Sequence, residues 1–148
     1  MNSKKFIIHT DGGARNNPGP AGIGVVITSP PDPLLSKERV PKAGEVVKEI
    51  SEYIGETTNN QAEYRAVLRA MEEAKKLDAE ELEFYLDSEL VVRQLNREYK
   101  VKSKELAPLF MKIYNLSQQF KKVTFTHVMR ERNKEADRLV NEAIDRRS

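Results

Sequence analysis

Five short apolar stretches, separated by turns that contain Gly, Pro and Asn, predict five β-strands. The expected strands are residues 6–10, 21–28, 45–54, 82–86 and 123–128. Residues 16–20 form the turn between the first two strands, and a proline-containing loop at residues 29–44 precedes the third. We therefore expect the first three strands to form an antiparallel meander.

Four longer segments have the spacing or the boundary residues of helices. The expected helices are residues 60–77, 88–98, 103–120 and 134–146. Ser88 or Asp87 caps the second helix, Pro108 is tolerated in the first turns of the third, and Asn133 caps the last. The first helix has the clearest pattern, with a stripe formed by Glu63, Val67, Ala70, Ala74 and Leu77.

The order of these elements predicts one α/β domain within the 148 residues. A helix that crosses between two strands of one sheet implies parallel pairing with a right-handed connection. The fourth and fifth strands should therefore lie parallel to the first. The expected fold is a mixed five-stranded sheet with helices on both faces.

The amino-acid composition excludes only a few kinds of site and classes of protein. The chain has 25 basic and 23 acidic residues, but seven basic and two acidic residues fall between positions 97 and 122. This basic segment fits a polyanionic partner, and it fits a solvated helix face equally well. The absence of cysteine excludes disulfides and thiolate metal sites, and two histidines argue against a histidine-rich zinc site. No stretch is long and apolar enough for a membrane span or a signal peptide, so we expect a cytoplasmic protein.

Two aspartates stand where buried strands are predicted to end. Asp11 follows residues 6–10, and Asp87 follows residues 82–86. If these strands are parallel neighbours, their carboxyl ends lie about 5 Å apart, at the edge where open α/β sheets bind ligands. A cation between the two carboxylates would replace their repulsion with attraction.

Two further acids lie near the starts of predicted helices. Glu63 lies on an apolar stripe, where an unpaired acid is costly, although its spacing from Asn60 also fits a capping box. Asp137 lies in the first turns of its helix, where an acid is also ordinary because it complements the helix dipole.

Together, the four carboxylates predict a metal site. Ligation by oxygen alone suits Mg²⁺ or Mn²⁺, and such clusters hold metal pairs that split phosphodiesters by in-line attack. The bare backbone of Gly12 and Gly13 would let a phosphate-bearing strand approach the site closely.

Four sequence blocks resemble the ribonuclease H type 1 family. They are TDGGARNNPGPAG with Asp11, TTNNQAEYRAVL with Glu63, LDSELVVRQL with Asp87 and RERNKEADRL with Asp137. The blocks occur in the family's order, cover nearly the whole chain, and agree with the family's order of strands and helices. The resemblance implies an endonuclease that cleaves the RNA strand of RNA–DNA hybrids and leaves 5′-phosphate and 3′-hydroxyl ends.

The resemblance also implies two Mg²⁺ ions, for which Mn²⁺ could substitute. Asp11 would bridge both ions, and Asp137 would help to hold the ion that activates water. Glu63 and Asp87 would hold the ion on the leaving-group side, with Glu63 near an RNA 2′-hydroxyl.

Further residues are expected to bind the substrate. The resemblance implies contacts in the minor groove of the hybrid that are largely independent of sequence, from Asn17, Asn59, Asn60 and Gln61. We also expect a basic segment to follow the phosphates of the DNA strand, with binding that weakens steeply in salt. This segment contains Arg97, Lys100, Lys102 and Lys104, with Tyr99 among them.

The chain departs from the family in the loop before the last aspartate. Many members carry a histidine there, whereas residues 129–133 contain none, and we consider Arg130 and Arg132 as partial substitutes. His127 lies ten residues before Asp137, but in a predicted strand, where we expect it to fill an aromatic position. We expect a structural role for His9 as well.

Two other departures concern the substrate. The basic protrusion that some members insert after the second helix is absent, and Glu89 stands where many relatives have a neutral amide.

Two alternatives to a hybrid-specific nuclease stay open. The fold is shared with nucleases that act on double-stranded RNA or junctions, and a fold does not determine a substrate. A module that binds hybrids without cleaving them is the second alternative, against which the four acids argue. We expect a monomer without an obligate protein partner, and the sequence leaves open whether residues 29–44 touch the substrate.

Overall fold

A computed structural model describes residues 4–30 and 44–147 of the chain. Most of the predicted loop at residues 29–44 therefore lies outside the described residues. The elements are β1 (Lys5–Ala14), β2 (Gly19–Thr28), β3 (Val46–Thr57), α2 (Asn59–Lys76), β4 (Glu81–Leu86), α3 (Glu89–Leu95), α4 (Leu106–Ser117), β5 (Lys122–His127), the 3₁₀ turn η1 (Arg130–Arg132) and α5 (Lys134–Arg146).

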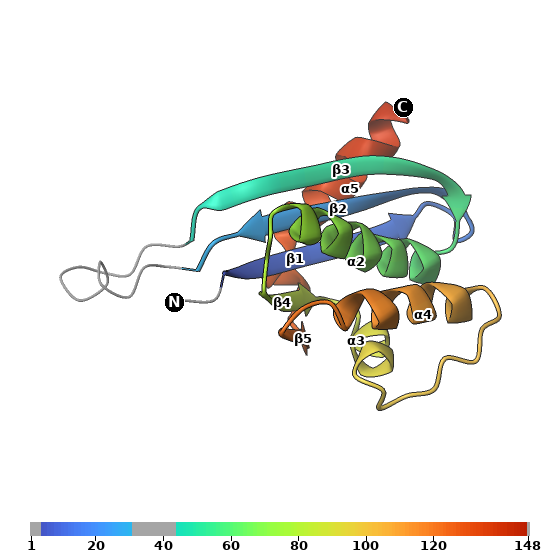
Figure 1. The fold of residues 1–148 in the computed structure, drawn as a ribbon. Coiled ribbons are helices and arrows are strands. Elements are labelled where there is room, and N and C mark those ends of the chain that lie inside the picture. Colours follow the sequence, from blue (N-terminus) through green and yellow to red (C-terminus); the bar gives the residue numbers. More distant parts are fainter. Residues whose placement is uncertain (1–3, 31–43, 148) are drawn as a thin grey trace.

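The strands form one mixed sheet in the order β3-β2-β1-β4-β5. β1 pairs with β2 and β2 with β3 in antiparallel fashion, whereas β4 lies parallel to β1 and β5 parallel to β4. Figure 1 shows α2 and α4 over one face of this sheet and α5 behind the other. The predicted sheet and the placement of helices on both faces are confirmed.

β1 is longer than the sequence pattern predicts. Asp11 lies inside the strand, where it pairs with Gly24 of β2, and the antiparallel pairing continues to Ala14. The parallel pairing with β4 stops earlier, at His9 and Tyr85. The prediction that Asp11 ends its strand is therefore wrong. What ends before Asp11 is the pairing with β4, because β4 is the shorter strand.

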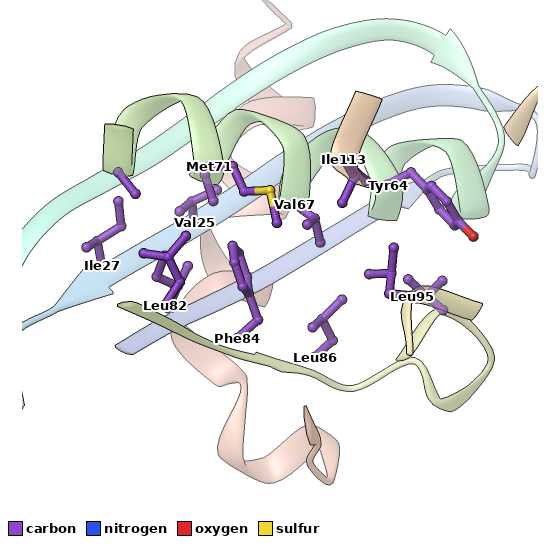
Figure 2. Packing of buried hydrophobic residues seen from close by; sticks show 14 of the residues in the cluster. Val25, Ile27, Tyr64, Val67, Met71, Leu82, Phe84, Leu86, Leu95 and Ile113 are labelled. Carbon is purple, nitrogen blue, oxygen red and sulfur yellow. The ribbon is translucent and has the colours of Figure 1, made fainter. Parts of the chain in front are cut away.

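The apolar core lies between the sheet and α2. Figure 2 shows Val67 and Met71 of α2 facing Phe84 and Leu86 of β4, and all four side chains are fully buried. Full burial of such a side chain stabilises the folded state by about 1.5–3 kcal/mol. The stripe predicted for the first helix is therefore the face that α2 buries.

The helix α5 lies unusually close to the sheet. A Cβ at Gly24 would be 2.1 Å from the carbonyl oxygen of Ala136, so only glycine allows this approach. The contact fixes the first turn of α5, which carries Asp137, over the strands β1 and β2.

Three helices differ from the predictions at their ends. α3 and α4 are shorter than expected, and α2 begins at Asn59 rather than at residue 60. Ser88 caps α3 as predicted, because its hydroxyl accepts a hydrogen bond from the Val91 amide. Asn133 precedes α5 as predicted, but its side chain makes no capping hydrogen bond. Among residues 4–30 and 44–147, none of the helices is both long and apolar enough to cross a membrane.

Candidate functional site

Three of the four predicted carboxylates lie together. Asp11 comes from β1, Glu63 from α2, and Asp87 from the residue that follows β4. Each offers an oxygen atom, and these atoms all lie within 4.8 Å of one another. The parallel pairing of β1 with β4 brings the two aspartates to one edge, and α2 crosses the sheet at the same point.

Glu63 does not act as a capping residue. Thr58 is the N-cap of α2, and its hydroxyl accepts a hydrogen bond from the amide of Gln61 at 3.2 Å. Gln61 occupies the third helical position, and its side chain accepts a hydrogen bond from the Thr57 hydroxyl. The capping-box alternative is therefore wrong, because Glu63 lies too far into the helix to reach back to its start.

The electrostatic environment of Asp11 and Glu63 is unusual. Asp11 is 7% exposed and Glu63 is 6% exposed. Burial, reinforced by the negative charge of Asp87, raises the pKa of Asp11 to about 7. Burial together with the charges of Asp11 and Asp87 raises the pKa of Glu63 well above its usual value. Without a cation, two buried carboxyl groups are thus expected to hold protons that exposed carboxyl groups would release.

Asp137 lies on the wall of the same cleft. It belongs to the first turn of α5 and is half-buried, and its charge adds to the rise in the pKa of Asp11. It is not one of the three residues whose oxygens lie within 4.8 Å of one another. The structure thus brings three acids into direct proximity and places the fourth beside them.

The carboxylates open into a cleft of about 420 Å³. The predicted residues Gly12, Gly13, Asn59, Asn60 and Arg130 also line it, and Arg132 is not among its lining residues in the described part of the chain. Several lining residues were not predicted from the sequence: Arg15, Ser88, Val140, Asn141 and Ile144. Asn141 could have been identified, since it follows Asp137 by four residues and so shares its helix face.

Close packing against α2 explains why position 12 is a glycine, and the sequence alone did not reveal this contact. A Cβ at this position would lie 2.3 Å from the carbonyl carbon and oxygen of Ala62 in α2. The missing side chain therefore admits the helix that carries Glu63. Close approach of a substrate strand to Gly12 and Gly13 stays a prediction.

A second cleft of about 560 Å³ adjoins the first and shares Asn59 and Asn60 with it. The other predicted groove residues, Asn17 and Gln61, line this second cleft. Asn17 also accepts a hydrogen bond from the Asn59 amide at 2.9 Å, and Asn59 accepts one from the Ala14 amide at 2.7 Å. These bonds tie the turn between β1 and β2 to the start of α2.

The predicted lysines are exposed on the segment between α3 and α4. Lys100 borders a more apolar pocket that also includes Tyr99. Ser103, which lies between Lys102 and Lys104 in the sequence, lines the second cleft. A continuous path thus runs from the carboxylates across the start of α2 to the lysine segment.

The histidines lie outside this arrangement. His9 stacks on Tyr85 with ring centroids 5.3 Å apart, and burial lowers its pKa. His127 lies in β5, as predicted, although the strand ends at His127 rather than at residue 128, and its side chain is exposed. Glu89 is exposed on α3, where it forms a salt bridge with Arg93.

The site fits a divalent metal ion. Its donors are all carboxylate oxygens, the set that Mg²⁺ and Mn²⁺ prefer. Glu63 Oε2 is buried without a hydrogen-bond partner among the described residues, and a cation would provide that partner.

Comparisons with known sequences show the proteins to which this chain is similar. A family model described as "Reverse transcriptase-like" matches residues 9–143. The chain is 39% identical over 141 residues to a bifunctional protein of Mycobacterium tuberculosis, a match that covers 95% of this chain and 36% of that protein. It is 36% identical over 135 residues to ribonuclease HI of Halobacterium salinarum, covering 91% of this chain and 62% of that protein. The chain thus spans less than two thirds of the length of these relatives.

Solved structures of ribonuclease H1 proteins are also similar to this chain. LC11-RNase H1, isolated from compost, is 48% identical with a TM-score of 0.81, and the match covers 99% of this chain and 98% of that chain. A structure of LC11-RNase H1 in complex with an RNA/DNA hybrid matches with 47% identity and a TM-score of 0.81, covering 95% of this chain and 97% of that chain.

Proposed function

The chain belongs to the ribonuclease H type 1 family, and we propose that it hydrolyses the RNA strand of RNA–DNA hybrids, leaving 5′-phosphate and 3′-hydroxyl ends. The observation that carries this proposal is the group of three carboxylates whose oxygens lie within 4.8 Å of one another. The complex of LC11-RNase H1 with an RNA/DNA hybrid supports the choice of substrate.

The proposed cofactor is a pair of Mg²⁺ ions, with Mn²⁺ as a substitute. Asp11 would contact both ions, Glu63 and Asp87 would hold one, and Asp137 would help to hold the other. Bound there, the ions would lower the pKa of a water molecule and neutralise charge on the phosphate. The proximity of the carboxylates, their repulsion, which together with burial raises the pKa of Glu63, and the unpartnered Glu63 Oε2 support this assignment.

The remaining residues of the two clefts would position the hybrid. Asn59 and Asn60 border both clefts, so they are suited to contact the minor groove close to the cleaved bond. Asn17 and Gln61 would extend these contacts along the second cleft. Amide groups exchange hydrogen bonds with 2′-hydroxyls and base edges, which favours recognition of shape over sequence.

Positive charge would bind the sugar–phosphate backbone. Lys100, Lys102 and Lys104 are exposed on the segment that contributes Ser103 to the second cleft, and from there they could follow the phosphates of the DNA strand. Arg130 lines the main cleft and is the better placed of the two arginines proposed to substitute for the loop histidine. A monomeric state and a cytoplasmic location stay predictions from the sequence.

The decisive experiment offers the protein end-labelled RNA–DNA hybrid, double-stranded RNA, double-stranded DNA and a DNA junction, each with Mg²⁺, with Mn²⁺ and with EDTA. We expect internal cleavage of the RNA strand of the hybrid in either metal and none in EDTA. Faster cleavage of double-stranded RNA or of the junction would instead indicate a related nuclease. Hybrid binding without cleavage in either metal would indicate a binding module.

A further inference from the structure

Asn133 is a buried polar residue without the local role that its position suggests. It directly precedes α5, and its side chain is 2% exposed. An asparagine at this position usually accepts a hydrogen bond from an amide of the first helical turn. Here the side chain makes no such bond. Its burial therefore has another reason.

The side chain of Asn133 connects two parts of the carboxylate site. Its Nδ2 donates to the carbonyl oxygen of Thr10 at 2.9 Å and to Asp87 Oδ2 at 3.3 Å. Thr10 immediately precedes Asp11 in β1. The register of β1 with β4 ends one residue earlier, at His9 and Tyr85. Asn133 thus links β1 to the residue after β4, beyond the point where backbone pairing stops.

The chemistry of the partners requires an amide donor. Both are acceptors, so only the NH₂ group of Asn133 can face them. Because the amide is neutral, it can hold Asp87 without competing with a bound cation. A positively charged lysine or arginine at this position would compete with the cation. Oδ1 of Asn133 is buried and lacks a partner among the described residues, so the hydrogen bonds found for this side chain are the two that its Nδ2 donates.

Asn133 also connects to the fourth acid through the backbone. Its carbonyl oxygen accepts a hydrogen bond from the Asp137 amide at 3.1 Å, the first helical bond of α5. A single residue therefore contacts the strand that carries Asp11, the carboxylate of Asp87 and the helical turn that carries Asp137.

We propose that Asn133 is a positioning residue, which holds the Asp87 carboxylate against β1 and so sets the spacing of the carboxylates for cation binding. The inference rests on the proposed function, because it takes the cluster to be the cation site. Side chains that orient metal ligands typically change metal affinity or activity by about 10- to 100-fold when they are removed.

The test compares Asn133→Ser and Asn133→Ala with the wild-type protein. Serine is about as good a helix N-cap as asparagine, but its shorter side chain cannot reach both Thr10 and Asp87, so it separates capping from positioning. For each protein, the Mg²⁺ concentration for half-maximal hydrolysis of the hybrid is measured together with kcat and KM. The rise in Tm on addition of subsaturating Mg²⁺ is measured without substrate.

We expect both variants to need about 10-fold more Mg²⁺, while KM for the hybrid at saturating Mg²⁺ changes by less than about 2-fold. The rise in Tm caused by Mg²⁺ should shrink in both. Asn96→Ala is the matched control, because Asn96 Nδ2 also donates to a strand carbonyl, that of Phe125 at 3.0 Å, outside the site. This control should leave the Mg²⁺ requirement unchanged.

The proposal is overturned if Asn133→Ser has a wild-type Mg²⁺ requirement and a wild-type rise in Tm, whatever its stability. Should Asn133→Ala fail to fold, the serine variant still gives this answer. A wild-type protein that gains Tm from Mg²⁺ but leaves the hybrid intact would contradict the proposed function alone. In that case the Tm comparison still decides the role of Asn133.

Discussion

The helix α2 buries an apolar part and an acidic part along one face. In its middle and C-terminal parts, Val67, Met71 and Ala74 are fully buried in the apolar core. One turn before Val67, Glu63 is buried as well, but its neighbours are two other carboxylates. The apolar part stabilises the folded state in any buffer, whereas the acidic part destabilises it unless a cation is present.

This difference separates the origin of stability from the origin of the proposed activity. The two parts share a helix, so they can be compared by substitutions a few residues apart. Changes in the apolar part should act on unfolding, and changes in the acidic part should act on cation binding and catalysis.

The largest expected effect comes from removing the charge of Asp11. Asp11→Asn should lower the rate of hybrid hydrolysis by at least about 1,000-fold, because a metal centre supplies several kcal/mol of transition-state stabilisation. Binding of the hybrid should change little, since the groove residues and lysines are intact. A single-turnover cleavage assay and a binding titration measure the two quantities.

Asp78→Asn is the matched control for this substitution. It makes the same chemical change at an exposed residue just after α2, where a positive φ of 59° suits asparagine as well as aspartate. Its rate and affinity should equal those of the wild-type protein. Retained turnover in Asp11→Asn would show that Asp11 does not bridge the metal ions.

The next effect concerns the pH dependence of stability in EDTA. The pKa of Asp11 rises from 3.8 in the unfolded chain to about 7 in the folded protein, so the folded state binds the proton more tightly. Through Asp11 alone, the free energy of unfolding should therefore fall as pH rises from about 4 to about 7, by on the order of 4 kcal/mol, and the raised pKa of Glu63 should add to this decline. Thermal or urea unfolding at several pH values measures this decline.

Two comparisons test the origin of the decline. Asp11→Asn should make it shallower, with Glu63 still contributing, and saturating Mg²⁺ should oppose it, because the ion binds the deprotonated cluster of the folded protein. The protein should still fold without Mg²⁺, since the apolar core does not involve the site. Stability that rises over this pH range in EDTA would contradict the raised pKa.

A smaller effect is expected in the apolar part of α2. Met71→Ala should lower the free energy of unfolding by about 3 kcal/mol, through lost apolar contact and an unfilled cavity. The Mg²⁺ concentration for half-maximal activity should not change. Met71→Leu conserves volume and should cost less than about 1.5 kcal/mol. A shift in Mg²⁺ requirement in either variant would mean that the two parts of α2 are coupled.

The smallest effect is expected from Asp87→Asn in EDTA. The substitution removes one repelling charge, while an amide oxygen at position 87 can still accept the hydrogen bond from Asn133. We expect the metal-free protein to gain about 1 kcal/mol of stability, measured by thermal unfolding beside Asp78→Asn. A lower Tm than that of the wild-type protein would count against clustering of the carboxylates.

Much of the fold could be predicted from local patterns. Five apolar segments marked the five strands, and the crossover helix between strands implied the parallel pairing of β4 with β1. That pairing was also sufficient to bring Asp11 and Asp87 to one edge. These predictions succeeded because burial imposes a period on the sequence, which can be read without knowing the partner surface.

Other features could not be predicted because their cause lies far away in the sequence. The length of β1 depends on its pairing with β2, which continues to Ala14 after the pairing with β4 has stopped, and the need for glycine at position 12 depends on the backbone of Ala62. The sequence predicted Asn133 as a helix cap, whereas its side chain donates hydrogen bonds to Thr10 and Asp87 instead. In each case the local pattern did not contain the contact with a distant segment that decides the outcome.

The sequence by itself determined the kind and order of the elements and the supply of four acids near their ends. Only the tertiary structure decided that three of these acids have oxygens within 4.8 Å of one another, and that the neutral amide of Asn133, from a fourth segment, donates a hydrogen bond to one of them. The physical reason is that the interactions involved act between residues at different separations along the sequence. Periodic burial acts on neighbouring residues of one helix or strand, whereas carboxylate repulsion and a bridging hydrogen bond exist only once distant segments are within a few ångströms of each other.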